Sequence, residues 1–93
     1  MRIAIVSREV APFFGAGIGT YAAEVSRAWA AAGHEVHFLS EGHEGFSERG
    51  PAELGATCHT VRPGPGRYPF ASHSKGVHHE LVALHDHTPF DYI

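Results

Sequence analysis

The first forty residues constrain the fold most, because apolar segments, glycines and a helical pattern follow one another there in a fixed order. A short apolar run over residues 2–7, rich in β-branched side chains, is followed by a loop of glycines and a proline over residues 8–18. An alanine-rich segment of helical periodicity, residues 19–32, leads to a second apolar run over residues 35–40. Strand, glycine loop, helix and strand in this order predict a βαβ unit with two parallel strands.

The rest of the chain extends this pattern. Residues 41–55 are expected to form a loop with a helical turn near residues 47–54, and a third strand is expected over residues 56–62. A further helix is expected over residues 72–86, and residues 90–93 have the character of the start of another strand. The expected fold class is therefore α/β, with a Rossmann-like parallel sheet that forms an incomplete domain over residues 1–93.

The first predicted helix has one apolar face. Tyr21, Val25 and Trp29 recur at helical spacing, so we expect this face to pack against the sheet. Glu24 falls between them and is expected to face solvent. Gly33, directly after the helix, is expected to end it in a left-handed conformation.

Composition excludes several kinds of partner. With 7 Lys and Arg against 10 Asp and Glu, the formal net charge is -3 at pH 7, so no nucleic acid partner is expected. No apolar run approaches the roughly 20 residues of a membrane span, and the first apolar segment is too short for a secretory signal. The single cysteine, Cys58, suits a reducing compartment, so we expect a cytoplasmic location and a small apolar role for this thiol.

The glycine loop is the candidate site. Gly17 and Gly19 lie at the expected mouth of the first helix, where main-chain N–H groups have no helical partner and the helix dipole is positive. Such groups can meet an anionic oxygen, and the hydroxyl of Thr20 is a candidate contact, with helix capping as its alternative role. The other interpretation is structural, because glycines also permit a tight turn from strand to helix.

Two known glycine motifs fit the loop less well. The dinucleotide fingerprint places its third glycine where this chain has Thr20, and it follows the first strand directly, whereas about seven residues intervene here. Glu41, after the second apolar run, would stand for the ribose-binding carboxylate, so a dinucleotide-dependent oxidoreductase remains an alternative. A triphosphate-binding loop is excluded because no Gly-Lys-Ser/Thr occurs.

The order of these motifs resembles the N-terminus of family-four glycosyltransferases of the GT-B fold, the glycogen synthase or group 1 type. Those enzymes begin with a strand, a Glu-x-x-Pro loop, a Gly-Gly-Ile/Val-Gly turn, a helix and a Gly-His-Glu-Val strand entry. The corresponding segments of this chain are Glu9 to Pro12, Ala16 to Gly19 and Gly33 to Val36. The end, Pro89 to Ile93, is similar to the family's lead into its fourth strand.

The resemblance implies retaining transfer of a sugar from a nucleotide-sugar donor to a small-molecule or glycan acceptor, with no separate cofactor and no metal. The N–H groups of Gly17, Ile18 and Gly19, with Thr20, would stabilise charge on the leaving diphosphate, and Glu9 would contact the acceptor. The family holds its donor chiefly in a second domain with a Glu-x7-Glu motif, which this chain lacks. We therefore expect a fragment that is inactive by itself, with its catalytic residues unassigned.

Histidines and an open sheet edge bear on other partners. Five of the nine histidines lie on or beside the last predicted helix: His73, His78, His79, His85 and His87. No two of them are one helical turn apart at a spacing of four, so no metal site is expected, and a non-enzymatic binding or assembly module remains a third alternative. A sheet that ended at Ile93 would leave an open edge, which favours self-association.

Overall fold

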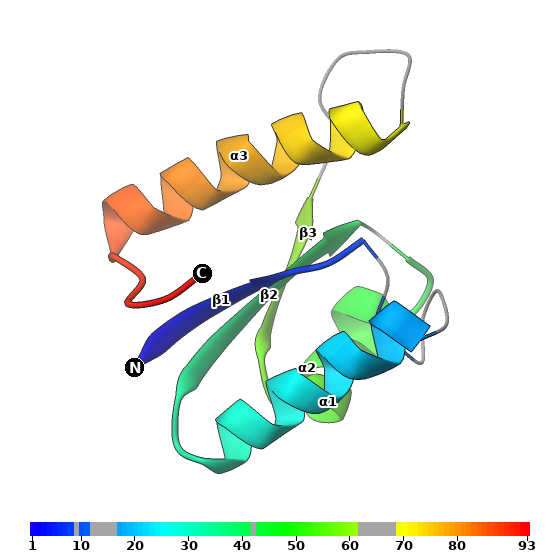
Figure 1. Ribbon diagram of the computed structural model, residues 1–93, viewed down its shortest axis with the longest axis vertical. Coiled ribbons are helices and arrows are strands. Elements are labelled where there is room, and N and C mark those ends of the chain that lie inside the picture. Colours follow the sequence, from blue (N-terminus) through cyan, green and yellow to red (C-terminus); the bar gives the residue numbers. More distant parts are fainter. Residues whose placement is uncertain (9, 12–16, 42, 62–68) are drawn as a thin grey trace.

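The computed structural model describes residues 1–8, 10–11, 17–41, 43–61 and 69–93, except for the side chains of residues 69–72. Its elements are β1 (Arg2–Val6), α1 (Gly17–Ala31), β2 (Glu35–Glu41), α2 (Phe46–Leu54), β3 (Thr57–Val61) and α3 (Pro69–His87) (Figure 1). Strands and helices alternate, as the pattern of apolar runs predicts.

The strands form one parallel sheet in the order β1-β2-β3, with β2 in the centre. Ile3 pairs with Val36 between β1 and β2, and Phe38 pairs with Cys58 between β2 and β3. The predicted α/β class with a parallel sheet is therefore confirmed, and the architecture is compatible with a small, incomplete Rossmann-like domain.

The last residues of the chain lie beside β1, on the edge that faces away from β2. Tyr92 makes a parallel bridge with Ile3, and the N–H of Ala4 donates to the Tyr92 carbonyl at 2.9 Å. Figure 1 shows the C-terminal end next to β1. The chain has thus crossed back over the sheet through α3, so the direction in which strands are added reverses at β1. In open α/β sheets, such a reversal marks the place where ligands bind.

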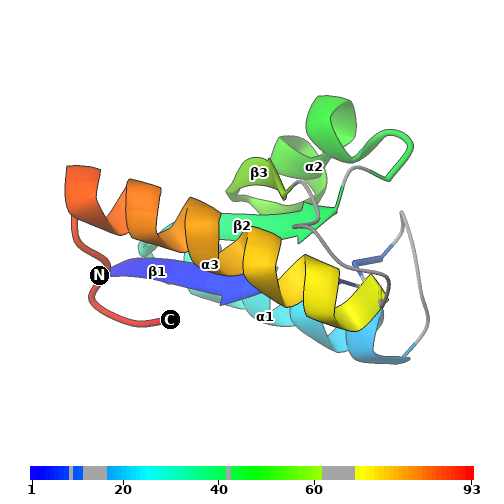
Figure 2. The same cartoon turned by 90° about the horizontal axis from the view of Figure 1, so that it is seen from above.

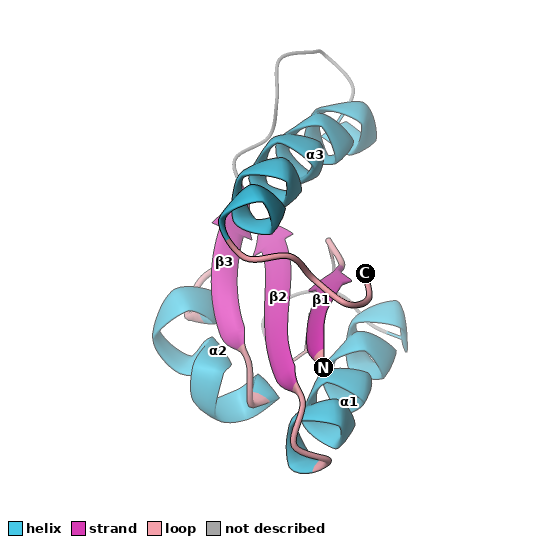
Figure 3. Ribbon diagram, turned by 90° about the vertical axis from the view of Figure 1, so that its left-hand side faces the viewer, coloured by secondary structure: helices cyan, strands magenta, loops and turns pink. Residues whose placement is uncertain are grey.

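Helices cover both faces of the sheet (Figure 3). Along β2, Phe38 packs with α1 and α2, whereas its neighbour Leu39 packs with Val77 of α3. This alternation follows the twofold period of a strand. Residues 36–40 are all buried, as expected for a central parallel strand that is covered on both sides.

The buried face of α1 differs from the predicted one. Tyr21 is 71% exposed, and the buried positions are instead the small residues Gly19, Ala22, Ala23 and Ser26. Small side chains let the helix lie close to the sheet, and the Ser26 hydroxyl donates to the Leu54 carbonyl at 2.9 Å. Of the predicted apolar positions, Trp29 is half-buried and packs against this core, whereas Tyr21 does not.

Helix ends agree with the glycine pattern, with shifts of two or three residues. Gly33 adopts a left-handed φ of 94° after α1, as predicted, and Gly55 does the same after α2 with φ 66°. Helix α1 begins two residues earlier than expected because the glycine turn is its first turn, and α3 begins at Pro69, a residue type that suits a first helical position.

None of the described helices is long and apolar enough to cross a lipid bilayer.

Candidate ligand site at the carboxyl end of the sheet

The residues of the candidate site lie at the carboxyl end of the sheet. Helices α1 and α3 both begin at this end, on opposite faces of the sheet (Figure 2). The carboxyl edge of the strands, where helix N-termini gather, is where parallel α/β sheets bind ligands. Of the residues predicted from sequence, Glu9 lies outside the described residues.

The glycine turn forms the start of α1. Gly17, Ile18 and Thr20 are exposed and Gly19 is buried. As the first four helical residues, they hold the N–H groups that have no partner within the helix. A Cβ built on Gly17 meets no atom within 4 Å, so the space in front of this residue is open. The predicted donors are therefore at a helix mouth, and the first two of them are accessible.

Residues 10 and 11 are fixed to α1 and the core. The Ala11 N–H donates to the Gly19 carbonyl at 3.2 Å, and Val10 is fully buried in the core beneath α1 and α2. The buried Gly19 is thus a contact point between this segment and the helix. Its predicted role as an accessible donor is less well supported than that of Gly17.

An ionic cluster lies beside the ends of β1 and β2. The Oε1 atom of Glu41 is 3.3 Å from the Arg8 Nε and also 3.3 Å from the His73 Nδ1. The Arg8 carbonyl accepts hydrogen bonds from the Ser40 hydroxyl at 3.3 Å and the His43 ring at 2.8 Å. Arg8 is therefore positioned through both its side chain and its main chain.

His73 is the unusual member of this cluster. The residue is only 9% exposed, yet its buried Nδ1 has no hydrogen-bond partner in the part of the chain that the structure describes, because the approach to Glu41 lacks hydrogen-bond geometry. A buried polar atom in this state costs free energy unless something satisfies it.

A groove of about 610 Å³ runs along the outer edge of β1. Its walls come from β1, from the face of α1 that carries Tyr21 and Trp29, and from Tyr92 and Ile93 at the end of the chain. Ile18 of the glycine turn lines it as well. The walls are mainly apolar, so the groove suits apolar groups, and the polar chemistry is confined to the helix mouth and the ionic cluster.

The structure also bears on other residues that the sequence singles out. Within the described part of the chain, no group of three or more His, Cys, Asp or Glu side chains is arranged to hold a metal ion. Burial raises the pKa of the Cys58 thiol to about 11, so this thiol is a poor nucleophile at neutral pH. Glu41, the candidate ribose-binding carboxylate of the dinucleotide alternative, instead pairs with Arg8.

Sequence reasoning missed the contacts of Arg8 and His73. The available signal was the position of Arg8 and Glu41 directly after two buried strands, since such ends meet at one edge of a parallel sheet. Nothing in the sequence indicated that His73, on a helix entered through a long proline- and glycine-rich segment, returns to this place.

Comparisons of this chain with protein-family models, curated proteins and solved structures find no match. The carboxyl end of the sheet offers N–H donors at the N-terminus of α1 and an Arg8–Glu41 ion pair beside the strand ends. Together these groups can hold an anionic group and can stabilise negative charge that develops on it.

Proposed function

We propose that this chain forms the glycine-turn half of the active site of a retaining glycosyltransferase, which moves a sugar from a nucleotide-sugar donor to an acceptor. The diphosphate of the donor would lie at the N-terminus of α1. The N–H groups of Gly17 and Ile18 would donate to its oxygens while the bond to the sugar breaks. On this proposal, residues that bind the nucleotide come from a further domain, and the 93-residue chain has no transferase activity by itself.

One observation carries the proposal: an open, exposed glycine turn starts a helix at the carboxyl end of a parallel sheet. The backbone conformation does not require glycine at position 17, because the described glycines with a positive φ are Gly33, Gly45 and Gly55. Space for close approach of a ligand is the remaining reason to favour glycine there.

The dinucleotide alternative is weaker on geometric grounds. In the dinucleotide fold the glycines form the direct turn from the first strand into the helix. Here β1 ends at Val6 and α1 begins at Gly17, with residues 7–16 between them. The oxidoreductase alternative therefore requires a longer connection than its fingerprint allows.

The test is anion binding, measured by NMR on the folded chain with inorganic pyrophosphate and with a uridine diphosphate as probes. We expect saturable shifts of the Gly17 and Ile18 amide signals. Gly17→Ala should abolish these shifts without lowering stability, since its methyl group enters open space and alanine favours helix over glycine by roughly 1 kcal/mol.

Ile18→Ala is the matched control, because it keeps the amide and removes only an exposed side chain. It should bind both probes like the unaltered chain. Equal binding by Gly17→Ala, or shifts that map to other helix ends instead, would rule out the glycine turn as the diphosphate site.

A further inference from the structure

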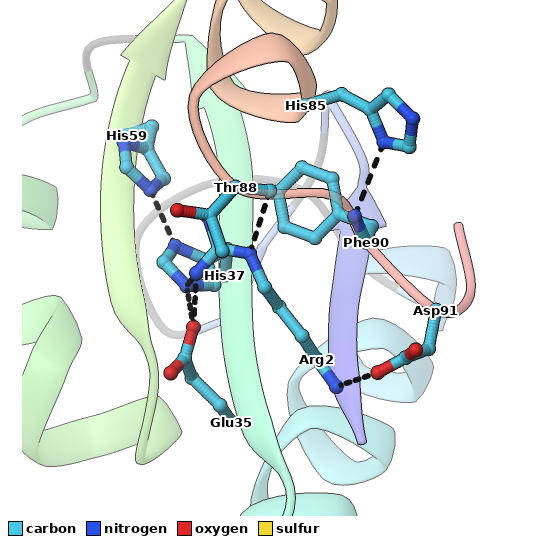
Figure 4. Close-up of polar contacts among 8 residues, drawn as sticks. All are labelled: Arg2, Glu35, His37, His59, His85, Thr88, Phe90 and Asp91. Carbon is cyan, nitrogen blue, oxygen red and sulfur yellow. Dashed lines mark hydrogen bonds and ion pairs between the residues drawn. The ribbon is translucent and has the colours of Figure 1, made fainter.

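A second polar cluster lies at the opposite, amino end of the sheet, on the face covered by α3 (Figure 4). His37 is 8% exposed and uses both ring nitrogens. Its Nδ1 is 2.8 Å from the His59 Nε2, and its Nε2 is 2.6 Å from the Glu35 Oε2. The same Glu35 oxygen forms an ion pair with Arg2. We call Arg2, Glu35, His37 and His59 the amino-end cluster.

Two charged groups meet at the His37 Nε2: the Glu35 carboxylate at 2.6 Å, which accepts, and the Arg2 Nη1 at 2.9 Å, which only donates. In either tautomer of His37, the 2.8 Å contact with His59 is one N–H···N bond that holds a single proton between the two rings. One further proton can be shared between the two rings with the bond kept, but a second would place two N–H groups head to head at 2.8 Å.

Arg2 joins the amino-end cluster to the C-terminal segment, residues 88–93. Its Nε donates to the Thr88 carbonyl at 3.0 Å, and its guanidinium carbon lies 4.6 Å from the centre of the Phe90 ring. Its main-chain N–H donates to the Asp91 carboxylate at 2.7 Å, and its carbonyl accepts from the Asp91 N–H at 2.8 Å. The orientation that Glu35 imposes on Arg2 therefore positions the segment.

Phe90 connects the segment to two imidazoles. Its ring meets the His37 ring edge to face, with centroids 5.4 Å apart, and it is 8% exposed. Its N–H donates to the His85 Nδ1 at 3.1 Å. Because Nδ1 can accept only while it carries no proton, protonation of His85 removes this bond. The contacts of residues 88–93 thus require that His85 is neutral and that His37 and His59 share an N–H···N hydrogen bond.

We propose that the amino-end cluster and His85 form a pH-sensitive latch, which holds residues 88–93 against β1 at neutral pH and releases them in acid. The charged groups that face the histidine pair are Arg2 from β1, Glu35 from β2 and Glu80 from α3. His85 from α3 and Asp91 from the segment itself contact Phe90 and Arg2 instead. Release separates Tyr92 from Ile3 and uncovers the outer edge of β1.

The direction in which the pKa of His59 is shifted agrees with release in acid. Burial, followed by the charge of His37, lowers the pKa of His59, and Glu80 opposes this. The folded chain therefore binds fewer protons at His59 than the unfolded chain, so the stabilisation is present above pH ~6.5 and is lost as the pH falls below it. The hydrogen bond from His37 lowers the pKa of Glu35, which keeps that carboxylate ionised throughout this range.

The test is site-resolved amide hydrogen exchange at pH 7.5 and pH 5.5, corrected for the intrinsic pH dependence of exchange. We expect protection of the Asp91 amide to fall by about tenfold or more, the change that corresponds to one pKa unit, while the amide of the fully buried Phe38 keeps its protection. His59→Gln, which cannot titrate, should lose most of this difference. His78→Gln, on the exposed side of α3, should retain it.

Three results would refute the latch: Asp91 keeps its protection at pH 5.5, Asp91 and Phe38 lose protection together, or His78→Gln abolishes the difference as well. If His59→Gln does not fold, His85→Gln replaces it, since the glutamine carbonyl can accept from Phe90 without titrating. The same reduced difference is then expected.

Discussion

The two ends of the sheet each hold a buried histidine beside an ion pair, but only one of these histidines is fully hydrogen-bonded. At the amino end, His37 uses both nitrogens, with His59 and Glu35 as partners. At the carboxyl end, the Nδ1 of His73 is buried, lies 3.3 Å from the Glu41 Oε1 and has no hydrogen-bond partner among the described residues. Buried polar groups that hydrogen-bond to one another stabilise the fold, whereas a buried polar atom without such a bond can still bond to a ligand. The difference agrees with ligand binding at the carboxyl end.

Backbone conformation accounts for glycines in turns at both ends of the sheet, but not for Gly17. Gly45, before α2 at the carboxyl end, has a left-handed φ of 81°. At the amino end, Gly33 and Gly55 have left-handed conformations that the turns into β2 and β3 require. At the carboxyl end, Gly17 has no positive φ and faces open space. The backbone therefore accounts for the amino-end glycines and leaves Gly17 without a structural reason, which is what the proposed diphosphate site supplies.

Gly55→Ala should have the largest effect on stability. At both amino-end glycines, a side chain in the left-handed region costs roughly 1 kcal/mol or more, but a Cβ on Gly55 would also lie 2.8 Å from the Cβ of Ala30. We expect Gly55→Ala to lower the free energy of unfolding by about 2–3 kcal/mol. Gly33→Ala, whose Cβ meets nothing within 4 Å, should cost about 1 kcal/mol. Urea denaturation at pH 7.5 measures both, and equal losses would contradict the contact with Ala30.

His37→Leu should have the next largest effect. Leucine fills a similar volume but leaves the Nε2 of half-buried His59 without its partner. The expected loss is about 2 kcal/mol in the free energy of unfolding at pH 7.5, from the lost hydrogen bonds and the desolvated donor. His79→Gln, at an exposed position of α3, is the control and should change stability by less than about 0.5 kcal/mol. An unchanged stability of His37→Leu would mean that the amino-end cluster does not stabilise the fold.

The elements of this fold were predictable, because each depends on a local pattern. The apolar run before Glu41 identifies β2, and Gly33 identifies the end of α1. The buried face of α1 was not predictable from hydrophobicity. Ser26 is buried and Tyr21 exposed because close packing against the sheet favours small side chains over large apolar ones.

The two polar clusters could not be predicted, because their members meet only through strand register. His37 and His59 lie 22 residues apart in the sequence, and the contact exists because Leu39, two residues further along β2, pairs with His59 of β3. A shift of one residue would turn one ring to the other face of the sheet. The glycine turn, by contrast, is a local pattern, so the sequence alone predicts its position at the start of α1.

His73→Leu gives the smallest expected effect and tests the comparison between the two ends most sharply. Removing a buried polar group that has no hydrogen-bond partner should leave the free energy of unfolding unchanged or raise it by up to about 1 kcal/mol. Glu41 keeps its ion pair with Arg8 in this variant. The sign is therefore opposite to that expected for His37→Leu, although both substitutions replace a buried histidine with leucine. Urea denaturation of both variants side by side at pH 7.5 measures the difference. A loss of about 2 kcal/mol for His73→Leu would mean that its Nδ1 is satisfied in solution, and the two ends of the sheet would then be equivalent.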